Sequence, residues 1–329
     1  MSADRHRLSV SLPYWQDRDP LDALAVAEAA EKFGYHRLWI GEMATFDAFA
    51  LATAIGLAPG RIPLCLGPFA VDVRSPATIA MGVASVAALT GRSVDVAIGS
   101  SSTVVVSGWH GRERNRTAVH LEDSARILRG LLAGEKVDFE GAVERIKGYR
   151  LRLAPPHSSI AVAAFGARAL AAAARTADRV VLNLVTPEQV SRCAELVRAA
   201  AADAGVPSPA ISVWVTAAAD PTADMRATVR RGVVGYLRAP GYDFMFEEAG
   251  FGEVVRLAHS GAHPRDVLAA VPDELPAAVG MFGDAAALAD RLGAYRRAGA
   301  DEVVVVPTTS AEEPAGHHTL ETLARIDHD

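Results

Sequence analysis

The sequence predicts an α/β protein with the fold of a (β/α)8 barrel, also called a TIM barrel. Short runs rich in β-branched residues alternate along the chain with longer alanine-rich segments that have helical spacing. The short runs are almost entirely apolar, as is typical of parallel strands that are covered on both faces. Eight such runs are present. A closed barrel is the simplest arrangement for eight strand-helix units.

The eight expected strands are spread over the whole chain. They are 8–12, 37–42, 62–69, 93–99, 159–165, 178–183, 210–218 and 301–307. Helix boundaries between them are marked by residues that favour starts and stops. Pro20 and Gly34 bound one expected helix, and Asp284 and Gly299 bound another.

Two stretches exceed what a minimal barrel needs. Residues 136–153 are typical of a hairpin, which we expect to lie over the barrel, and residues 239–283 form an insertion before the last strand. Insertions of this size usually lie near the carboxyl ends of the strands, where the active site of a barrel is built. The sequence contains no internal repeat and no low-complexity linker, so we expect one domain over residues 1–329.

Composition limits the partners that we expect. Of the 329 residues 50% are hydrophobic, and the net charge is −6, which argues against nucleic acid as a partner. The sequence has neither an apolar leader nor a run long enough to cross a membrane, so we predict a cytoplasmic protein without a membrane partner. Cys65 and Cys193 lie far apart within apolar segments, and we expect both to be reduced core residues.

Residues that follow the expected strands are the candidates for chemistry in a barrel. Glu42 follows the second strand, where no helix cap is required, so a place in the pocket is favoured. Asp47 either serves as an acid or caps the next helix, and the two roles are equally plausible from the sequence. Arg74 follows the third strand and is either an anion contact or a solvated charge.

The fourth and fifth strands end in segments suited to anions. Ser100 to Thr103 offer hydroxyl groups and backbone amides, or form an ordinary polar loop. Trp109 and the neighbouring His110 suggest a shaped surface, although a lone loop histidine is more often structural. Gly166 opens a helix at about Ala167, and free N–H groups at a helix start bind phosphate; the alternative is a plain turn with Arg168 in solvent.

No metal site is expected. His259 and His263 have the spacing of metal ligands on a helix, but Gly261 and Pro264 argue against that helix and no third ligand is evident. The same reasoning applies to His317 and His318. Neither a nucleophile elbow nor a Cys/His pair is present, so the site suits a bulky bound cofactor that carries the chemistry itself.

The order of the motifs resembles the bacterial luciferase-like superfamily, in its branch of coenzyme F420-dependent oxidoreductases that includes the methylenetetrahydromethanopterin reductases. The resemblance extends from about residue 8 to 310. It rests on "GYHRLWIGEM", "RIPLCLGPFAVDVRSPATIAM", "LTGRSVDVAIGSSS", "VVVSGWHGR", "LLAGEKVDFEG", "YRLRLAPP", "IAVAAFGARALAAAARTADRVVLN" and "FGDAAALADRLGAYRRAGADEVVVVP".

The resemblance implies a barrel with a deazaflavin or flavin across its carboxyl-terminal mouth. The family has a bulge, often with a non-prolyl cis peptide, where this chain has residues 67–73. By motif position, the resemblance also implies that the cofactor contacts Phe69, Ala70, Val71, Ser100, Ser101, Ser102, Gly166, Ala167 and Arg168. Substrate is expected near Glu42, Trp109, His110 and the insertion. A proton, where one is needed, is expected from Glu42, Asp47 or His110, with Glu42 first.

The sequence also departs from the family pattern. Some F420-dependent dehydrogenases have a histidine after strand 2 and a glutamate after strand 4, where this chain reads "GEMATFD" and "GSSST". Sugar-phosphate dehydrogenase activity is therefore not expected. "FGARAL" also lacks the proline that often follows the glycine.

Three functions follow as hypotheses. The first is F420-dependent hydride transfer to or from a small organic substrate by a homodimer. The second is an FMN-dependent monooxygenase with the same fold. The third is a barrel that binds a cofactor without catalysis, which the shortage of an acid/base pair suggests.

Overall fold

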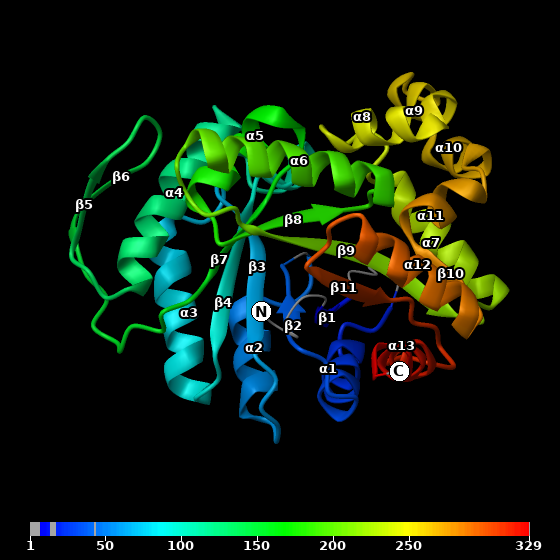
Figure 1. The fold of residues 1–329 in the computed structure, drawn as a ribbon, viewed down its shortest axis with the longest axis horizontal. Coiled ribbons are helices and arrows are strands. Elements are labelled where there is room, and N and C mark those ends of the chain that lie inside the picture. Colours follow the sequence, from blue (N-terminus) through cyan, green and yellow to red (C-terminus); the bar gives the residue numbers. More distant parts are fainter. Residues whose placement is uncertain (1–6, 14–17, 43, 329) are drawn as a thin grey trace. The chain divides into compact units, whose positions relative to one another are not determined.

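The computed structural model describes residues 7–13, 18–42 and 44–328 (Figure 1). Strand and helix alternate along these residues in the predicted order, and a strand lies within each of the eight predicted ranges or within two residues of it. The strands are β1 (Arg7–Ser11), β2 (Leu38–Ile40), β3 (Leu64–Ala70), β4 (Val94–Gly99), β7 (Ile160–Ala163), β8 (Arg179–Asn183), β9 (Ala210–Ala219) and β11 (Glu302–Pro307).

Contacts divide the chain into two compact units. The first unit consists of Met1–Tyr35, Leu182–Arg192 and Val213–Asp329, and the second of His36–Val181 and Cys193–Ser212. The boundaries fall within β8, α6 (Pro187–Asp203) and β9. The single domain expected over residues 1–329 stays a prediction.

The second unit contains a parallel sheet with the order β2, β3, β4, β7 and β8. Its connections are helical, as parallel strands require. They are α2 (Ala48–Leu57), α3 (Pro76–Thr90), the π-helix η1 (Val104–Trp109), α4 (Thr117–Leu132) and α5 (Gly166–Thr176). In Figure 1 α3 and α4 lie beside β4, on the side away from β3.

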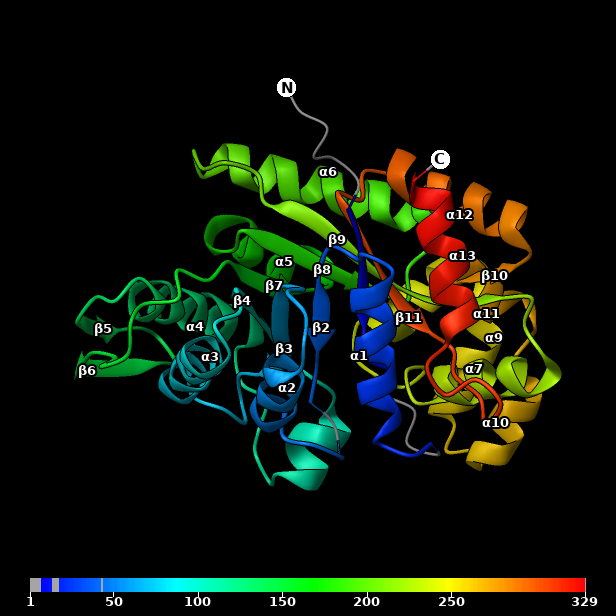
Figure 2. The same cartoon turned by 90° about the horizontal axis from the view of Figure 1, so that it is seen from below.

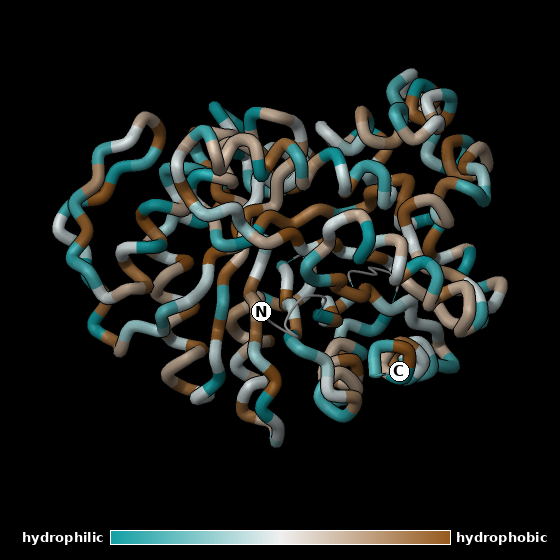
Figure 3. Tube along the Cα trace, in the orientation of Figure 1, coloured by the Kyte–Doolittle hydropathy of each residue, from teal (hydrophilic) through white to brown (hydrophobic). Residues whose placement is uncertain are grey.

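The strands of this unit are buried because helices cover the sheet. Leu64, Cys65 and Leu66 of β3 are at most 1% exposed, and the strands appear mainly brown in Figure 3. Asp95 is a charged residue within β4. It forms an ion pair with Arg37 at 2.9 Å and accepts a hydrogen bond from the Ser159 N–H at 2.8 Å. Those partners compensate the cost of placing a carboxylate within a strand.

The expected hairpin is confirmed as the antiparallel pair β5 (Val137–Glu140) and β6 (Arg145–Tyr149). It packs against α4, and Figure 1 shows it beyond that helix. The Asp123 carboxylate of α4 accepts hydrogen bonds from the N–H groups of Val143 and Glu144, at 2.9 and 3.2 Å. A buried side chain of α4 therefore holds the hairpin turn.

The first unit contains a parallel sheet with the order β10, β9, β11 and β1, where β10 is Met281–Gly283. Its helices outside the insertion are α1 (Asp22–Lys32), α7 (Ala223–Val234), α12 (Ala285–Arg297) and α13 (His317–His328). Figures 1 and 2 both show α1 beside α13. Tyr35 links these segments, because its hydroxyl donates to the Leu320 carbonyl at 2.8 Å.

The predicted insertion, residues 239–283, belongs to the first unit and is helical up to Val279, whereas its last residues form the strand β10. It contains α8 (Tyr242–Phe246), the π-helix η2 (Glu247–Phe251), α9 (Gly252–His259), α10 (Pro264–Ala270) and α11 (Glu274–Val279). Buried residues of these helices, among them Phe246, Val255 and Leu275, join Val233 and Leu237 in one apolar core. This core explains why a long segment between two barrel strands is ordered.

The predicted helix boundaries are largely confirmed. Asp284 caps α12, because its carboxylate accepts a hydrogen bond from the Ala287 N–H at 2.9 Å, and the helix ends before Gly299. In the same way α1 lies between Pro20 and Gly34. No helix within the described ranges combines the length and the apolar character needed to cross a bilayer.

We expect Asp284→Ala to lower the free energy of unfolding by about 1 kcal/mol, because a helix N–H loses its acceptor. Asp290→Ala, on the exposed surface of the same helix, is the control and should change stability by less than about 0.5 kcal/mol. Urea denaturation of both variants measures the difference. Equal losses in the two variants would contradict the capping role.

Candidate active site

The predicted cofactor segments lie at one edge of the sheet in the second unit. Ala70 of β3 is in register with Gly99 of β4, and Ile98 of β4 with Val162 of β7. Because the strands are parallel, their carboxyl ends meet at the same edge. The residues that follow each strand, 71–74, 100–103 and 164–168, therefore leave the sheet side by side.

The strand ends approach each other closely. A Cβ atom on Gly99 would lie 3.3 Å from both the Pro68 Cβ and the Ala163 Cβ. Gly67 has φ +111°, and a Cβ there would lie 2.2 Å from the Ala97 carbonyl oxygen. Only glycine allows this approach of two backbones. These two buried glycines therefore set how closely the strands pack just before the sheet edge.

The bulge implied by the family resemblance is present in β3. The pairing register with β4 shifts between Leu66 and Phe69. The cis peptide in this segment joins Gly67 to Pro68, so it is a prolyl bond and not the non-prolyl bond frequent in the family. The bulge lies directly before Ala70 and Val71, two of the predicted cofactor contacts.

Phe69 supports the bulge from within the core. Its side chain is fully buried, and its ring lies 4.8 Å from the ring of Phe49 on α2. The Arg74 guanidinium lies over both rings, 5.2 Å from the Phe49 centroid and 5.8 Å from the Phe69 centroid. Val71 is also buried, whereas Ala70 is partly exposed. Direct contact of these three residues with a cofactor stays a prediction.

Arg74 binds both carboxylates that follow β2. Its Nε donates to Glu42 Oε2 at 2.7 Å, its Nη2 donates to Glu42 Oε1, and Nη2 also donates to Asp47 Oδ2 at 2.6 Å. Hydrogen bonds to Glu42 are the largest cause that raises the pKa of Arg74. Arg74, which the sequence makes a candidate contact for a bound anion, therefore forms its ion pairs with two carboxylates of the protein itself.

Asp47 caps α2 as well as pairing with Arg74. Its Oδ1 accepts hydrogen bonds from the N–H groups of Phe49 and Ala50, at 3.0 and 2.9 Å. Burial raises the pKa of Asp47, but the bonds from Ala50, Arg74 and Phe49 outweigh burial and lower it below 3.8. Of the two roles open in the sequence, the capping role is the one that this geometry supports.

The serine-rich segment after β4 has an uncommon backbone. Ser101 has φ +54°, in the left-handed region that residues with a Cβ seldom adopt. Ser102 accepts a hydrogen bond from the Val105 N–H at 3.3 Å, which brings its side chain to the start of η1. Ser101 is exposed and the other two serines are partly exposed, so their hydroxyl groups are accessible at the sheet edge.

Trp109 and His110 lie at the far end of η1 and are both exposed, Trp109 to 47%. Gly166, Ala167 and Arg168 form the exposed first turn of α5, which has no side-chain cap. The first N–H groups of this helix therefore remain open to an anion. The predicted pocket role of Trp109 and the predicted proton transfer by His110 stay predictions.

Comparison with known proteins identifies the family. A family model described as luciferase-like monooxygenase matches residues 6–302. The chain belongs to this family. The 5,10-methylenetetrahydromethanopterin reductase of Archaeoglobus fulgidus is 24% identical over 286 residues, which are 84% of this chain and 86% of that protein. The chain is thus a luciferase-like oxidoreductase.

Solved structures of luciferase-like proteins confirm the predicted fold. The coenzyme F420 dependent tetrahydromethanopterin reductase from Methanopyrus kandleri has a TM-score of 0.82 at 17% identity, covering 98% of this chain and 99% of that one. The oxygenating constituent of 3,6-diketocamphane monooxygenase from Pseudomonas putida, in complex with FMN, has a TM-score of 0.68 at 18% identity, covering 97% of each chain. The (β/α)8 barrel is the fold of this protein.

One cluster of charged side chains near this edge of the sheet is not indicated by any pattern in the sequence. His120 of α4 lies between two carboxylates, with its Nδ1 3.0 Å from Asp72 Oδ1 and its Nε2 2.8 Å from Glu144 Oε1. Asp72 follows the predicted cofactor contact Val71. The three residues are separated by 48 and 24 positions, so no local motif marks them.

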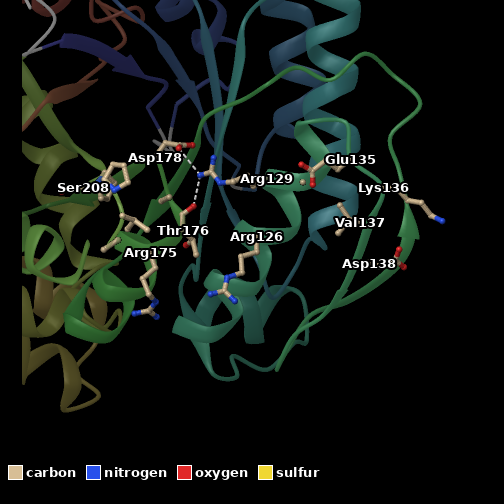
Figure 4. A pocket seen from close by; sticks show the side chains of 16 residues that line it. Arg126, Arg129, Glu135, Lys136, Val137, Asp138, Arg175, Thr176, Asp178 and Ser208 are labelled. Atoms are coloured by element: carbon tan, nitrogen blue, oxygen red, sulfur yellow. Dashed lines mark hydrogen bonds and ion pairs between the residues drawn. The ribbon is translucent and has the colours of Figure 1, made fainter. Parts of the chain in front are cut away.

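A surface hollow of the second unit lies away from this edge (Figure 4). Its lining includes Thr176 and Asp178, which precede β8 and so lie at the amino end of the parallel strands. Arg129 there bonds Asp178 at 3.1 Å and the Thr176 carbonyl at 2.9 Å. Arg126 and Arg175 each bond Glu122 at 2.6 Å. Because these arginines are paired, the hollow offers little net charge to a ligand.

The histidines considered for metal binding serve other contacts. His259 ends α9, whereas His263 caps α10 by accepting a hydrogen bond from the Arg265 N–H at 3.2 Å. They therefore lie on different helices. His317 contacts Lys32 at 3.2 Å, and His318 contacts Asp220 at 3.0 Å.

We expect Arg74→Met to lower the free energy of unfolding by about 1–2 kcal/mol at pH 7, because Glu42 and Asp47 lose their shared cation. The difference from wild type should shrink as the pH falls through the lowered pKa of Asp47, since a protonated Asp47 no longer needs Arg74. Urea denaturation at pH 7 and at pH 3 measures both effects.

The control is Arg126→Met, which removes a guanidinium whose side chain is 53% exposed and paired with Glu122. Exposed ion pairs contribute little, so we expect a loss below about 0.5 kcal/mol. A loss equal to that of Arg74→Met, or a difference for Arg74→Met that does not change between the two pH values, would contradict the structural role of the cluster.

Proposed function

We propose that this protein is an F420-dependent oxidoreductase that transfers a hydride between the deazaflavin and an organic substrate. The observation that carries the proposal is the meeting of residues 69–71, 100–102 and 166–168 at one sheet edge, since β3, β4 and β7 are neighbours in parallel register. Two relatives named above support this branch: the 5,10-methylenetetrahydromethanopterin reductase of Archaeoglobus fulgidus and the tetrahydromethanopterin reductase of Methanopyrus kandleri, which is described as dependent on coenzyme F420.

The residues at this edge fit such a cofactor. Gly166 has φ +71° and nothing within 4 Å of the place where a Cβ would lie, so the space above the start of α5 is open. The uncapped N–H groups there suit a phosphate, and Ser100 and Ser102 can donate hydrogen bonds beside them. Glycine at positions 67 and 99 lets β3 and β4 pack closely just before this edge.

The bound deazaflavin would supply a carbon that gives or accepts a hydride. The role of the chain is then to bind, to orient and to exclude water, which accounts for much of the rate in reactions of this kind. Phe69 and Phe49 pack beneath the bulge and hold it in place. Trp109, at the end of η1, is the candidate for the wall of the substrate pocket.

The ion pairs change the order of the proton-donor candidates. Glu42 and Asp47 both accept hydrogen bonds from Arg74, so their oxygens are engaged within the protein. His110 is exposed directly after η1, and we propose it ahead of Glu42. A small-molecule substrate, a homodimer and a cytoplasmic location complete the proposal.

FMN is the alternative cofactor, because the Pseudomonas putida monooxygenase structure was solved with it. Titration of the purified protein with F420 and with FMN, followed by cofactor fluorescence, separates the two. We expect binding of F420. Tight binding of FMN without a response to F420 would replace the proposal with a flavin-dependent monooxygenase, and binding without turnover of any substrate would favour a non-catalytic barrel.

Gly166→Ala tests the cofactor site. We expect the Kd for F420 to rise about tenfold, because a methyl group at φ +71° disturbs the first turn of α5 and narrows the phosphate space. Isothermal titration or fluorescence measures the Kd.

The matched control is Gly205→Ala, since Gly205 has φ +66° and equally open surroundings but follows α6. Both variants should lose about 1–2 kcal/mol of stability from the left-handed backbone. An unchanged Kd in Gly166→Ala would remove residues 166–168 from the site.

A further inference from the structure

The cluster of Asp72, His120 and Glu144 joins three parts of the second unit. Asp72 belongs to the segment between β3 and α3, His120 to the first turn of α4, and Glu144 to the turn of the β5–β6 hairpin. Their side chains are 4%, 9% and 19% exposed. The cluster is therefore an ion-pair network largely removed from water.

The geometry at His120 requires a cation. Each ring nitrogen lies within hydrogen-bond distance of a carboxylate oxygen, at 3.0 Å for Asp72 and 2.8 Å for Glu144. A neutral imidazole has one N–H group and could donate to only one of these oxygens. Burial lowers the pKa of His120, but Glu144 and Asp72 together outweigh burial and raise it above 6.5.

Asp72 depends on His120. Its Oδ2 is buried and has no hydrogen-bond partner within the described residues, so the bond from His120 to Oδ1 is the compensation for a buried carboxylate. The backbone on either side of Asp72 turns tightly, because the N–H groups of Val73 and Arg74 both donate to the Ala70 carbonyl at 3.0 Å. The position of Asp72 is thus linked to that of Ala70 and Val71.

Glu144 is held independently of His120. Its backbone N–H donates to Asp123 of α4, and its carbonyl accepts from the Gly141 N–H at 2.9 Å. Arg116, before α4, donates to the carbonyl of Ala142 in the same turn at 3.2 Å. Asp123 and Arg116 are therefore engaged with the backbone of this turn, while Arg145, next to Glu144 in the sequence, pairs with Glu140.

We propose that His120 is a positioning residue, which as an imidazolium ties Asp72 to the hairpin turn and so fixes residues 69–72 against the cofactor ring. The presence of a cofactor ring rests on the proposed function, whereas the contacts of His120 with Asp72 and Glu144 do not depend on it. When the pH rises through the pKa of His120, one carboxylate loses its donor and the segment loosens. The stabilisation is complete below about pH 6.5 and is lost above the raised pKa.

The test is the pH dependence of cofactor binding in Glu144→Gln. This variant keeps the shape of the side chain and removes one of the two charges that favour the imidazolium. In wild type we expect the Kd for F420 to rise on the alkaline side of the His120 titration. In Glu144→Gln that inflection should move to lower pH, because one of the two charges that raise the pKa of His120 is gone.

The matched control is Glu140→Gln, the same substitution on the same hairpin. Glu140 is 77% exposed and pairs with Arg145 at 3.3 Å. We expect its profile to coincide with that of wild type. An inflection that does not differ between wild type and Glu144→Gln overturns the proposal.

A second measurement separates this proposal from the proposed function. NMR follows the titration of the His120 ring, and hydrogen exchange follows the amides of Val71 and Val73. We expect the protection of these amides to fall as His120 loses its proton. In Glu144→Gln the same fall should occur at a lower pH than in wild type. This result supports the tie even if neither F420 nor FMN binds, whereas unchanged protection through the titration overturns it.

Discussion

The parallel pairing of β3 with β4 is the constraint on which the candidate site depends. It begins at Leu64 beside Val94 and, after the shift at the bulge, ends at Ala70 beside Gly99. The two backbones approach so closely at Gly67 that a Cβ would touch the Ala97 carbonyl. Because this pairing sets where both strands end, it also sets where the bulge and the serine segment leave the sheet.

Two cations hold the segment that follows the bulge, one on each side. Arg74 binds Glu42 and Asp47 from the β2 side, and His120 of α4 binds Asp72 while its other nitrogen binds Glu144. In each case a cation lies between two carboxylates, which offsets the cost of desolvating them. The loop between β3 and α3 is thus fastened at its start and at its end, although it contains little regular structure.

Sequence patterns predicted the parts of this structure that depend on local physics. Apolar runs identified the strands because a covered parallel sheet leaves no polar face, and Asp284 identified a helix start because its side chain replaces a missing acceptor. Residues 136–153 were expected to contain a hairpin, and it is present, but its packing against α4 depends on Asp123 and on turn amides that no periodicity reveals.

The ion pairs of the site could not be predicted in this way. Arg74 and Glu42 are 32 residues apart, and His120 and Asp72 are 48 residues apart, so their contact follows from the fold and not from any spacing. Glu42 was favoured for the pocket because no helix cap was required there. Arg74 is visible after the third strand, but only the parallel register of β2 and β3 brings it to Glu42.

The same ion pairs bear on how the proposed reaction would proceed. A carboxylate that accepts two hydrogen bonds from a guanidinium has both oxygens engaged, which fixes its position beside the cation. Glu42 is in this position, and Asp47 shares the cation. The acidic residues beside the bulge therefore serve to hold backbone. If hydride transfer takes place at this edge, its rate would rest mainly on how rigidly residues 69–72 hold the ring, and a proton, where one is needed, would come from Glu42, Asp47 or the less constrained His110.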